Sequence, residues 1–284
     1  MPEIDKSLFQ YLSSAQNITI KKIKGLQSSG AKGAKIRQHE NLALIEGIHL
    51  IKSWIEAGNA NTQIKSIFTT ESGLLNGEVA GLISDILNAR SLEEVKFYLV
   101  EESLWHELSE LENAPHLLGL ISIPESKPLT DIHGDCVVLD AVQDSGNVGS
   151  ILRTAAAAGF KQIICIKGTA QVWSSKVLRA GMGAHAALEI FEGIEVAECL
   201  SYVHSRLLTT QLQGSQSLFE LKEQLSQPVA WIFGNEGAGV SQEFIDRSGG
   251  VLIPQEQSVE SLNVSAAAAV CLFETRRVRL ERSA

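Results

Sequence analysis

The second half of the chain alternates short apolar segments with helical ones, and this alternation constrains the fold more than any other feature. The apolar segments predict buried strands over residues 136–142, 162–167, 207–211, 229–233 and 251–253. Helices are expected over residues 147–158 and 264–281, and the second ends among cations that suit a helix C-terminus: Arg276, Arg277, Arg279 and Arg282. Apolar strands that alternate with helices form mostly parallel sheets covered on both faces. We therefore expect an α/β domain here.

The first half also alternates elements, around shorter apolar segments. Helices are expected over residues 37–57, with Gly58 as the stop, and over 80–89 and 101–111; strands are expected over 64–69, 95–100 and 117–123. Residues 124–134 are rich in turn-forming residues. The predicted organisation is a basic N-terminal arm (1–38), a smaller α/β domain (39–124), a linker (125–134) and a larger α/β domain (135–284).

The charge of the chain is unevenly distributed. The formal net charge is −9, yet the charged residues within 17–38 are all cationic: Lys21, Lys22, Lys24, Lys32, Lys35 and Arg37. A basic segment on an acidic chain indicates a local contact with a polyanion such as RNA. A solvated, flexible arm explains the same composition equally well. Charge alone leaves both interpretations open.

Several classes of protein are disfavoured by composition. The longest apolar run, residues 266–273, has eight residues, whereas a membrane span needs roughly 20. The first ten residues lack the apolar core of a signal peptide, so a cytoplasmic protein is expected, with an organelle matrix as the alternative. The histidines lack metal-ligand spacing, and no metal is expected. The cysteines form no C-x-x-C pair and are expected to be reduced and buried: Cys136, Cys165, Cys199 and Cys271.

A first polar segment, with Asp144, Asn147 and Arg153, begins the helix that follows the first strand of the larger domain. Gly146 and Gly149 allow a ligand to approach the backbone closely, and the free N–H groups of a helix start favour anions. A loop-borne asparagine and a helix-borne arginine can converge on one ligand. A helix cap plus a surface arginine is the alternative interpretation.

Two further polar segments follow strands in the same way. Glu236 lies in a loop with three glycines within six positions, Gly234-Asn-Glu-Gly-Ala-Gly239, where a simple turn is the alternative. Ser261 and Asn263 lie between the strand ending at Ile253 and the last helix, where helix capping is the alternative. Open α/β sheets bind ligands at the carboxyl ends of their strands, where these loops are expected.

Taken in order, these segments resemble the motifs of the SpoU (TrmH-like) family of 2′-O-ribose RNA methyltransferases in the SPOUT class. The motifs are N-V-G-x-x-x-R-T, G-N-E-G-x-G and I-P…S-L-N-V-S, and the resemblance extends from about residue 135 to the C-terminus. The smaller domain resembles the L30e-like substrate-binding domain of the ribosomal-RNA members, on the strength of 22–27, Arg37 and 44–47. The family pattern differs at Ser145, Gln255 and Gln257, none of which is a catalytic position.

The resemblance implies a fold, a cofactor and a set of roles. The fold is a trefoil-knotted α/β methyltransferase domain that forms a homodimer, and the active site draws on both subunits. S-adenosylmethionine is expected to bind at Thr210, Gly234, Ile253 and Leu262. The expected catalytic residues are Asn147, Arg153, Glu236, Ser261 and Asn263, with Arg153 contacting the substrate phosphate and helping to activate the ribose hydroxyl. RNA is expected to contact Lys21, Lys22, Lys24, Lys35 and Arg37.

The resemblance leaves the substrate open. Ribosomal RNA is favoured over transfer RNA because of the additional N-terminal domain. Transfer RNA methylation, base methylation, and a non-catalytic RNA-binding or ribosome-assembly role are the alternatives. The segment Ser261-Leu-Asn263-Val favours a ribose over a base as the methyl acceptor.

Overall fold

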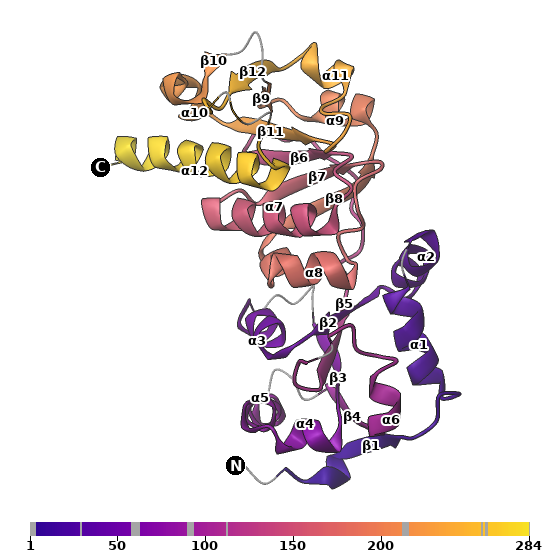
Figure 1. The fold of residues 1–284 in the computed structure, drawn as a ribbon. Coiled ribbons are helices and arrows are strands. Elements are labelled where there is room, and N and C mark those ends of the chain that lie inside the picture. Colours follow the sequence, from indigo (N-terminus) through magenta and orange to yellow (C-terminus); the bar gives the residue numbers. More distant parts are fainter. Residues whose placement is uncertain are drawn as a thin grey trace. The chain divides into compact units, whose positions relative to one another are not determined.

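The computed structural model describes residues 4–28, 30–57, 63–89, 94–111, 113–211, 216–256, 258 and 261–283. The chain forms two compact units (Figure 1). Unit 1 comprises residues 1–125 with 173–186, and unit 2 comprises 126–172 with 187–284. Among the described helices, none has the length and apolar character that a membrane crossing requires. The functional boundaries expected at residues 39–124 and 135–284 stay predictions.

Unit 2 is built on a seven-stranded sheet in which all neighbouring strands are parallel, in the order β10-β12-β9-β11-β6-β7-β8. Every residue of strand β6 is buried, and its first four residues are apolar, as expected for a strand covered on both faces; the fifth, Asp140, is a buried carboxylate. The predicted parallel α/β architecture is confirmed. The strands are β6 (Cys136–Asp140), β7 (Gln162–Ile166), β8 (Glu189–Ile194), β9 (Arg206–Thr210), β10 (Gln216–Ser217), β11 (Val229–Gly234) and β12 (Gly249–Leu252).

Helices cover this sheet, and two of them frame the site. Helix α7 (Ser145–Ala158) begins at Asp144, whose carboxylate accepts a hydrogen bond from the Asn147 N–H at 2.8 Å, and ends at Gly159 with a φ of +93°. Helix α12 (Val264–Ser283) packs along α7 (Figure 1). The remaining elements are α9 (Val196–Tyr202), α10 (Lys222–Leu225), α11 (Gln242–Ile245) and the 3-10 turns η3 (Ala184–Ala187, shared with unit 1) and η4 (Leu218–Glu220).

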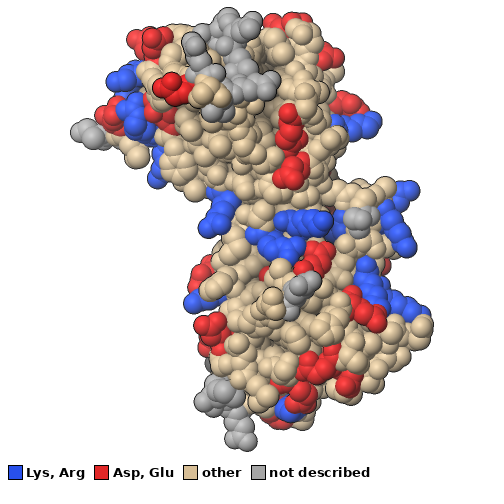
Figure 2. Space-filling view, in the orientation of Figure 1, with Lys and Arg blue, Asp and Glu red and all other residues tan. Residues whose placement is uncertain are grey.

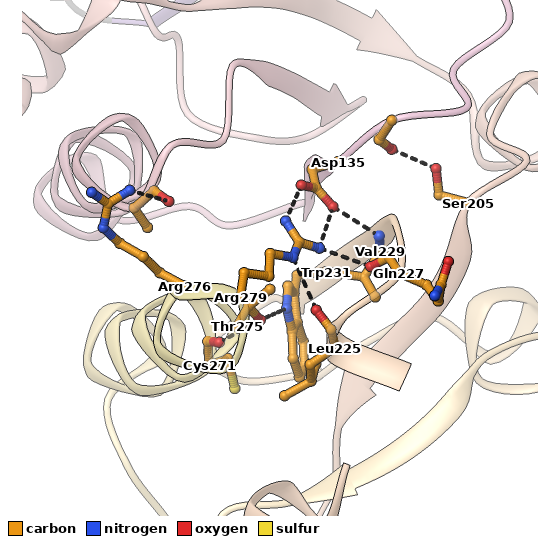
Figure 3. A network of polar contacts seen from close by, with 12 residues as sticks. Asp135, Ser205, Leu225, Gln227, Val229, Trp231, Cys271, Thr275, Arg276 and Arg279 are labelled. Carbon is orange, nitrogen blue, oxygen red and sulfur yellow. Dashed lines mark hydrogen bonds and ion pairs between the residues drawn. The ribbon is translucent and has the colours of Figure 1, made fainter. Parts of the chain in front are cut away.

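The C-terminal half of α12 is anchored near the amino ends of β6 and β11 (Figure 3). The Arg279 guanidinium forms an ion pair with Asp135, with one N···O distance of 2.8 Å. The Trp231 indole N–H donates to the Thr275 hydroxyl at 3.0 Å, and both side chains are fully buried. Arg279 also donates to two backbone carbonyls, those of Leu225 and Gln227. These contacts fix the axis of α12 and direct its N-terminus toward the carboxyl ends of the strands.

Unit 1 contains a five-stranded mixed sheet in the order β1-β4-β3-β5-β2, in which β5 is antiparallel to both of its neighbours. The strands are β1 (Phe9–Leu12), β2 (Leu42–Glu46), β3 (Ile64–Thr69), β4 (Lys96–Val100) and β5 (Leu117–Ser122). The helices are η1 (Lys6–Leu8), α1 (Ile18–Gln27), α2 (Gly30–Glu40), α3 (Ile48–Ala57), α4 (Glu71–Leu75), α5 (Gly77–Asn88), α6 (Glu102–Trp105) and α8 (Ser175–Gly181).

The single helix expected over residues 37–57 is wrong. The segment contains the end of α2, strand β2 and helix α3. Asn41 has a φ of +52° and Gly47 a φ of +95°, so the backbone leaves the helical region twice. The apolar residues between them pair with β5 instead of lining a helix face. Gly58, the expected stop, lies outside the described residues. The helix expected over 101–111 is likewise reduced to α6.

The basic segment is folded. Residues 17–38 form most of α1 and α2, and the α1 side chains of Ile20, Ile23 and Leu26 are buried in the core of unit 1. The alternative of a solvated, flexible arm is therefore wrong. The apolar residues among the lysines Lys21, Lys22 and Lys24 have a helical spacing, which the interpretation from charge overlooked, and they form a separate face of α1.

Candidate active site

Three of the five expected catalytic side chains are joined by hydrogen bonds at the carboxyl end of the unit 2 sheet. Glu236 follows β11, Asn147 lies in the first turn of α7, and Asn263 immediately precedes α12. The Asn147 Nδ2 atom donates to Glu236 Oε1 at 3.0 Å, and Asn263 Nδ2 donates to Asn147 Oδ1 at 3.0 Å. Residues up to 116 positions apart in sequence thus form one hydrogen-bonded chain.

Glu236 is held as an ionised acceptor. Its carboxylate accepts hydrogen bonds from the backbone N–H groups of Gln143 and Asp144, both at 3.1 Å, as well as from Asn147. Burial by itself raises the pKa of Glu236, but the hydrogen bonds from Asn147 and from these backbone groups outweigh it and lower the pKa. An ionised carboxylate engaged by three protein donors is a positioning group and a poor general base.

The carboxylate fixes the direction of both amides. Because Glu236 only accepts, Asn147 must turn its NH₂ group toward it, which leaves its oxygen for Asn263. Asn263 then directs its own oxygen at the α12 N-terminus, where it accepts from Ser265 N (2.9 Å), Ser265 Oγ (2.6 Å) and Ala266 N (3.3 Å). Each amide keeps a second N–H without an acceptor among the described residues. The site therefore presents N–H donors to its ligand.

Arg153 and Ser261 do not take part in the hydrogen bonds that join Glu236, Asn147 and Asn263. Arg153 is exposed on α7 and forms no hydrogen bond or ion pair with a described residue. Ser261 is exposed two residues before Asn263 and also lacks such a partner. The structure brings together Asn147, Glu236 and Asn263 only, and the roles assigned to the other two stay predictions.

The residues expected to hold S-adenosylmethionine cluster at one edge of the sheet. Strands β12, β9 and β11 are neighbours, so Thr210 and Gly234, which end their strands, lie at the same edge as Ile253, which follows β12. A Cβ at Gly234 would lie 2.3 Å from the Gly239 backbone, so only glycine allows the loop to fold back there. Leu262 is 39% exposed. Backbone polar groups beside exposed apolar surface fit a nucleoside cofactor.

Two of the three residues that depart from the family pattern lie in or beside elements of the site. Ser145 is the first residue of α7, a position where proline is also favoured. Gln255 follows β12, and Gln257 lies outside the described residues. The sequence interpretation missed the backbone N–H groups of Gln143 and Asp144, because residue types do not report where a backbone amide points.

The expected RNA contacts lie in unit 1, and one of them needs correction. Arg37 is 4% exposed and donates to the backbone carbonyls of Leu26 and Ser28, so it ties α2 to the end of α1. A buried guanidinium with such partners is a structural residue and not a phosphate contact. Gly33 allows α2 to pack closely against the end of α1, because a Cβ there would lie 1.7 Å from the Ser28 carbonyl oxygen.

The lysines remain at the surface, and Figure 2 shows blue atoms gathered over α1 and α2. Lys22 pairs with Glu40 at 2.6 Å, and Lys24 pairs with Glu107. Lys21 and Lys35 are exposed and form no ion pair with a described residue. These two are the lysines in the set that can bind a phosphate without giving up a protein partner.

Comparison with known proteins identifies the family of the chain. Residues 135–273 match the sequence model of the SpoU rRNA Methylase family. A 23S rRNA (guanosine(2553)-2′-O)-methyltransferase, RlmP of Bacillus subtilis, is 29% identical over 93% of this chain and 98% of its own. An uncharacterised tRNA/rRNA methyltransferase of Synechocystis is 30% identical over 94% of this chain and 93% of its own.

The fold has close matches among solved structures. The AdoMet-bound rRNA methyltransferase from Sinorhizobium meliloti superposes with a TM-score of 0.76 at 26% identity, covering 95% of this chain and 98% of that one. Sequence relatives and structural neighbours thus match the chain across nearly its whole length. The chain belongs to the SpoU rRNA methylase family.

Proposed function

We propose that the chain is an S-adenosylmethionine-dependent methyltransferase that methylates a ribose 2′-hydroxyl of ribosomal RNA. The observation that carries the proposal is the one-directional chain Glu236–Asn147–Asn263, which presents unused N–H donors beside the edge of the sheet that fits the cofactor. The relatives named as 23S rRNA 2′-O-methyltransferases and the AdoMet-bound neighbour support the reaction and the cofactor.

The reaction needs positioning more than it needs a strong base. When bound, S-adenosylmethionine would supply a methyl group on a cationic sulfur. As the ribose 2′-oxygen bonds to that methyl carbon, the carbon–sulfur bond would break, neutral S-adenosylhomocysteine would leave, and the hydroxyl proton would pass to solvent. Asn147 and Asn263 orient ribose or phosphate oxygens with their second N–H groups. Holding two reactants in line contributes about 7–11 kcal/mol in favourable cases. Arg153 acts by electrostatic activation of the hydroxyl, since a guanidinium stays protonated.

We infer that two copies of the chain form the active enzyme. Helix α12 has an exposed apolar stripe opposite its buried face, with Val270 36%, Phe273 47% and Leu280 57% exposed. Such a stripe on a helix suits a twofold interface. Arg153, exposed on the neighbouring α7, is then placed to serve a site shared between copies. Light scattering after size exclusion tests this: Phe273→Glu is expected to be monomeric, and a monomeric unsubstituted protein would contradict it.

Ribosomal RNA is proposed as substrate, bound through unit 1 by Lys21, Lys35 and the neighbouring lysines, in a domain that we propose to be L30e-like. The cytoplasm is the proposed location. The test uses tritiated S-adenosylmethionine with ribosomal or transfer RNA. Alkali-resistant dinucleotides that contain tritium are expected from ribosomal RNA, because a 2′-O-methyl group blocks alkaline cleavage. Label in a methylated base would favour base methylation. Label in transfer RNA alone would show that transfer RNA is the substrate in place of ribosomal RNA, and no label in either RNA would contradict the reaction.

A further inference from the structure

The side chain of Asn235 joins the loop that carries Glu236 to the end of β6. Asn235 Nδ2 donates to the Ala141 carbonyl at 2.9 Å. The oxygen of the same amide accepts from Gly237 N and Ala238 N, both at 2.9 Å, and so closes the turn around Glu236. The Asn235 backbone exchanges two further hydrogen bonds of 2.9 Å with Gly239.

Ala141 has an unusual backbone at this junction. Its φ is +55°, in the left-handed region that a residue with a Cβ adopts at an energetic cost. The neighbouring Asp140 is 5% exposed and accepts from Ser241 N at 2.6 Å. Two adjacent residues at the end of β6 therefore hold the loop both before and after Glu236, and the contact from Asn235 falls on the strained one.

The conformation at Ala141 sets where the next residues point. Two residues later the chain turns the N–H groups of Gln143 and Asp144 toward Glu236, each at 3.1 Å. A left-handed residue directs the following chain differently from an extended one, so a change of φ at Ala141 would rotate both N–H groups away from Glu236. Asn235 therefore influences both sides of these hydrogen bonds: the N–H groups of Gln143 and Asp144, through Ala141, and the acceptor Glu236, through the turn.

We propose that Asn235 is a positioning residue for methyl transfer: by holding Ala141 in the left-handed conformation it aims two backbone N–H groups at Glu236 and so fixes Asn147. This inference rests on the proposed function. Asn235 contacts neither reactant in this scheme. Its effect travels through Glu236 and Asn147 to the ribose.

Two substitutions test the role. Asn235→Asp keeps the acceptor for the turn and places a carboxylate oxygen against the Ala141 carbonyl; Asn235→Ser keeps a shorter turn acceptor and adds no charge. Both are expected to lower kcat about tenfold, the effect of one lost hydrogen bond, with the KM for RNA within about threefold. Amide hydrogen exchange in the peptide containing Gln143 and Asp144 is expected to accelerate.

A second-site change separates positioning from general damage. Glycine adopts positive φ without a Cβ penalty, so adding Ala141→Gly to either variant is expected to restore most of kcat. The matched control is Asn41→Gly, at a position in unit 1 with a φ of +52°. It is expected to restore nothing in kcat, even where it raises the thermal midpoint.

The outcomes are distinct. Variants at Asn235 with unchanged kcat and unchanged exchange at Gln143 and Asp144 overturn the inference. Equal recovery with Ala141→Gly and with Asn41→Gly also overturns it, because recovery would then reflect overall stability. An unsubstituted protein that transfers no methyl group to RNA would instead contradict the proposed function, and the exchange measurement would still decide what Asn235 holds in place.

Discussion

Replacing Glu236 with glutamine removes one hydrogen bond of the site with almost no change in shape. The best fit keeps the glutamine oxygen where Oε1 accepts from Asp144 N and Asn147, and places its NH₂ group where Oε2 accepts from Gln143 N. Two donors then face each other. A hydrogen bond to a charged group is worth about 1.5–3 kcal/mol, which corresponds to a decrease in kcat of roughly 10- to 150-fold.

Folding should change much less than activity. Glu236 is exposed in the free protein, so solvent screens its hydrogen bonds and the free energy of unfolding is expected to fall by less than about 1 kcal/mol. The lowered pKa keeps the carboxylate ionised at and above its ordinary range, and its contribution is lost only as pH falls through the lowered value. The ratio of wild-type to Glu236→Gln activity is therefore expected to be flat from about pH 6 to 8.

The assay is tritiated methyl transfer to ribosomal RNA, with thermal unfolding measured in parallel. Glu243→Gln, an exposed glutamate on α11, is the matched control and is expected to match the wild type. A kcat of Glu236→Gln within about twofold of the wild type would refute the argument that this carboxylate orients Asn147. So would a loss of activity that is fully explained by unfolding at the assay temperature.

Three further changes have defined outcomes. Arg153→Ala is expected to abolish methyl transfer and to leave the cofactor affinity measured by calorimetry nearly intact. The control Arg206→Ala, at the amino end of β9, is expected to retain activity. An active Arg153→Ala variant would contradict the role assigned to Arg153. Joint charge reversal of Lys21 and Lys35 is expected to weaken RNA binding and reduce the salt slope by roughly 0.7–0.9 per lost contact, and Lys65→Glu is the control for net charge. An unaltered isotherm would count against the RNA surface. Thr275→Val leaves the buried Trp231 N–H without its acceptor and is expected to cost about 1–3 kcal/mol in denaturant unfolding, while Thr275→Ser keeps the hydrogen bond; equal stability of the two variants would contradict this.

The sequence predicted the parts of the fold that depend on local pattern. Strands β6, β7 and β11 each contain an apolar run of at least four residues that is buried on both faces, so their position and the parallel sheet follow from the sequence. Edge strand β8 was missed because its pattern, with Glu189 and Glu192, lacks a continuous apolar run. The helix expected over 37–57 failed because its apolar residues Leu42 to Ile45 pair with strand β5, which lies 74 to 80 positions away in sequence.

The candidate site was predicted by residue type and not by geometry. The motifs named Asn147, Glu236 and Asn263, and the structure shows how they are joined: an acceptor-only carboxylate dictates the direction of two amides. Composition could not show that Arg37 is buried, since its partners are backbone carbonyls. Nor could it show the link from Asn235 to Ala141, which joins residues 94 positions apart. The knotted threading and the dimer stay predictions from the family resemblance.

The central claim is that the site built by Asn147, Glu236 and Asn263 methylates a ribose of ribosomal RNA. The most direct measurement is a map of 2′-O-methyl groups in ribosomal RNA from cells with the gene, without it, and with only the Glu236→Gln form. One 2′-O-methyl position is expected to disappear without the gene, to return with the unsubstituted gene, and to return only partly with Glu236→Gln. Identical maps in all strains would contradict the account.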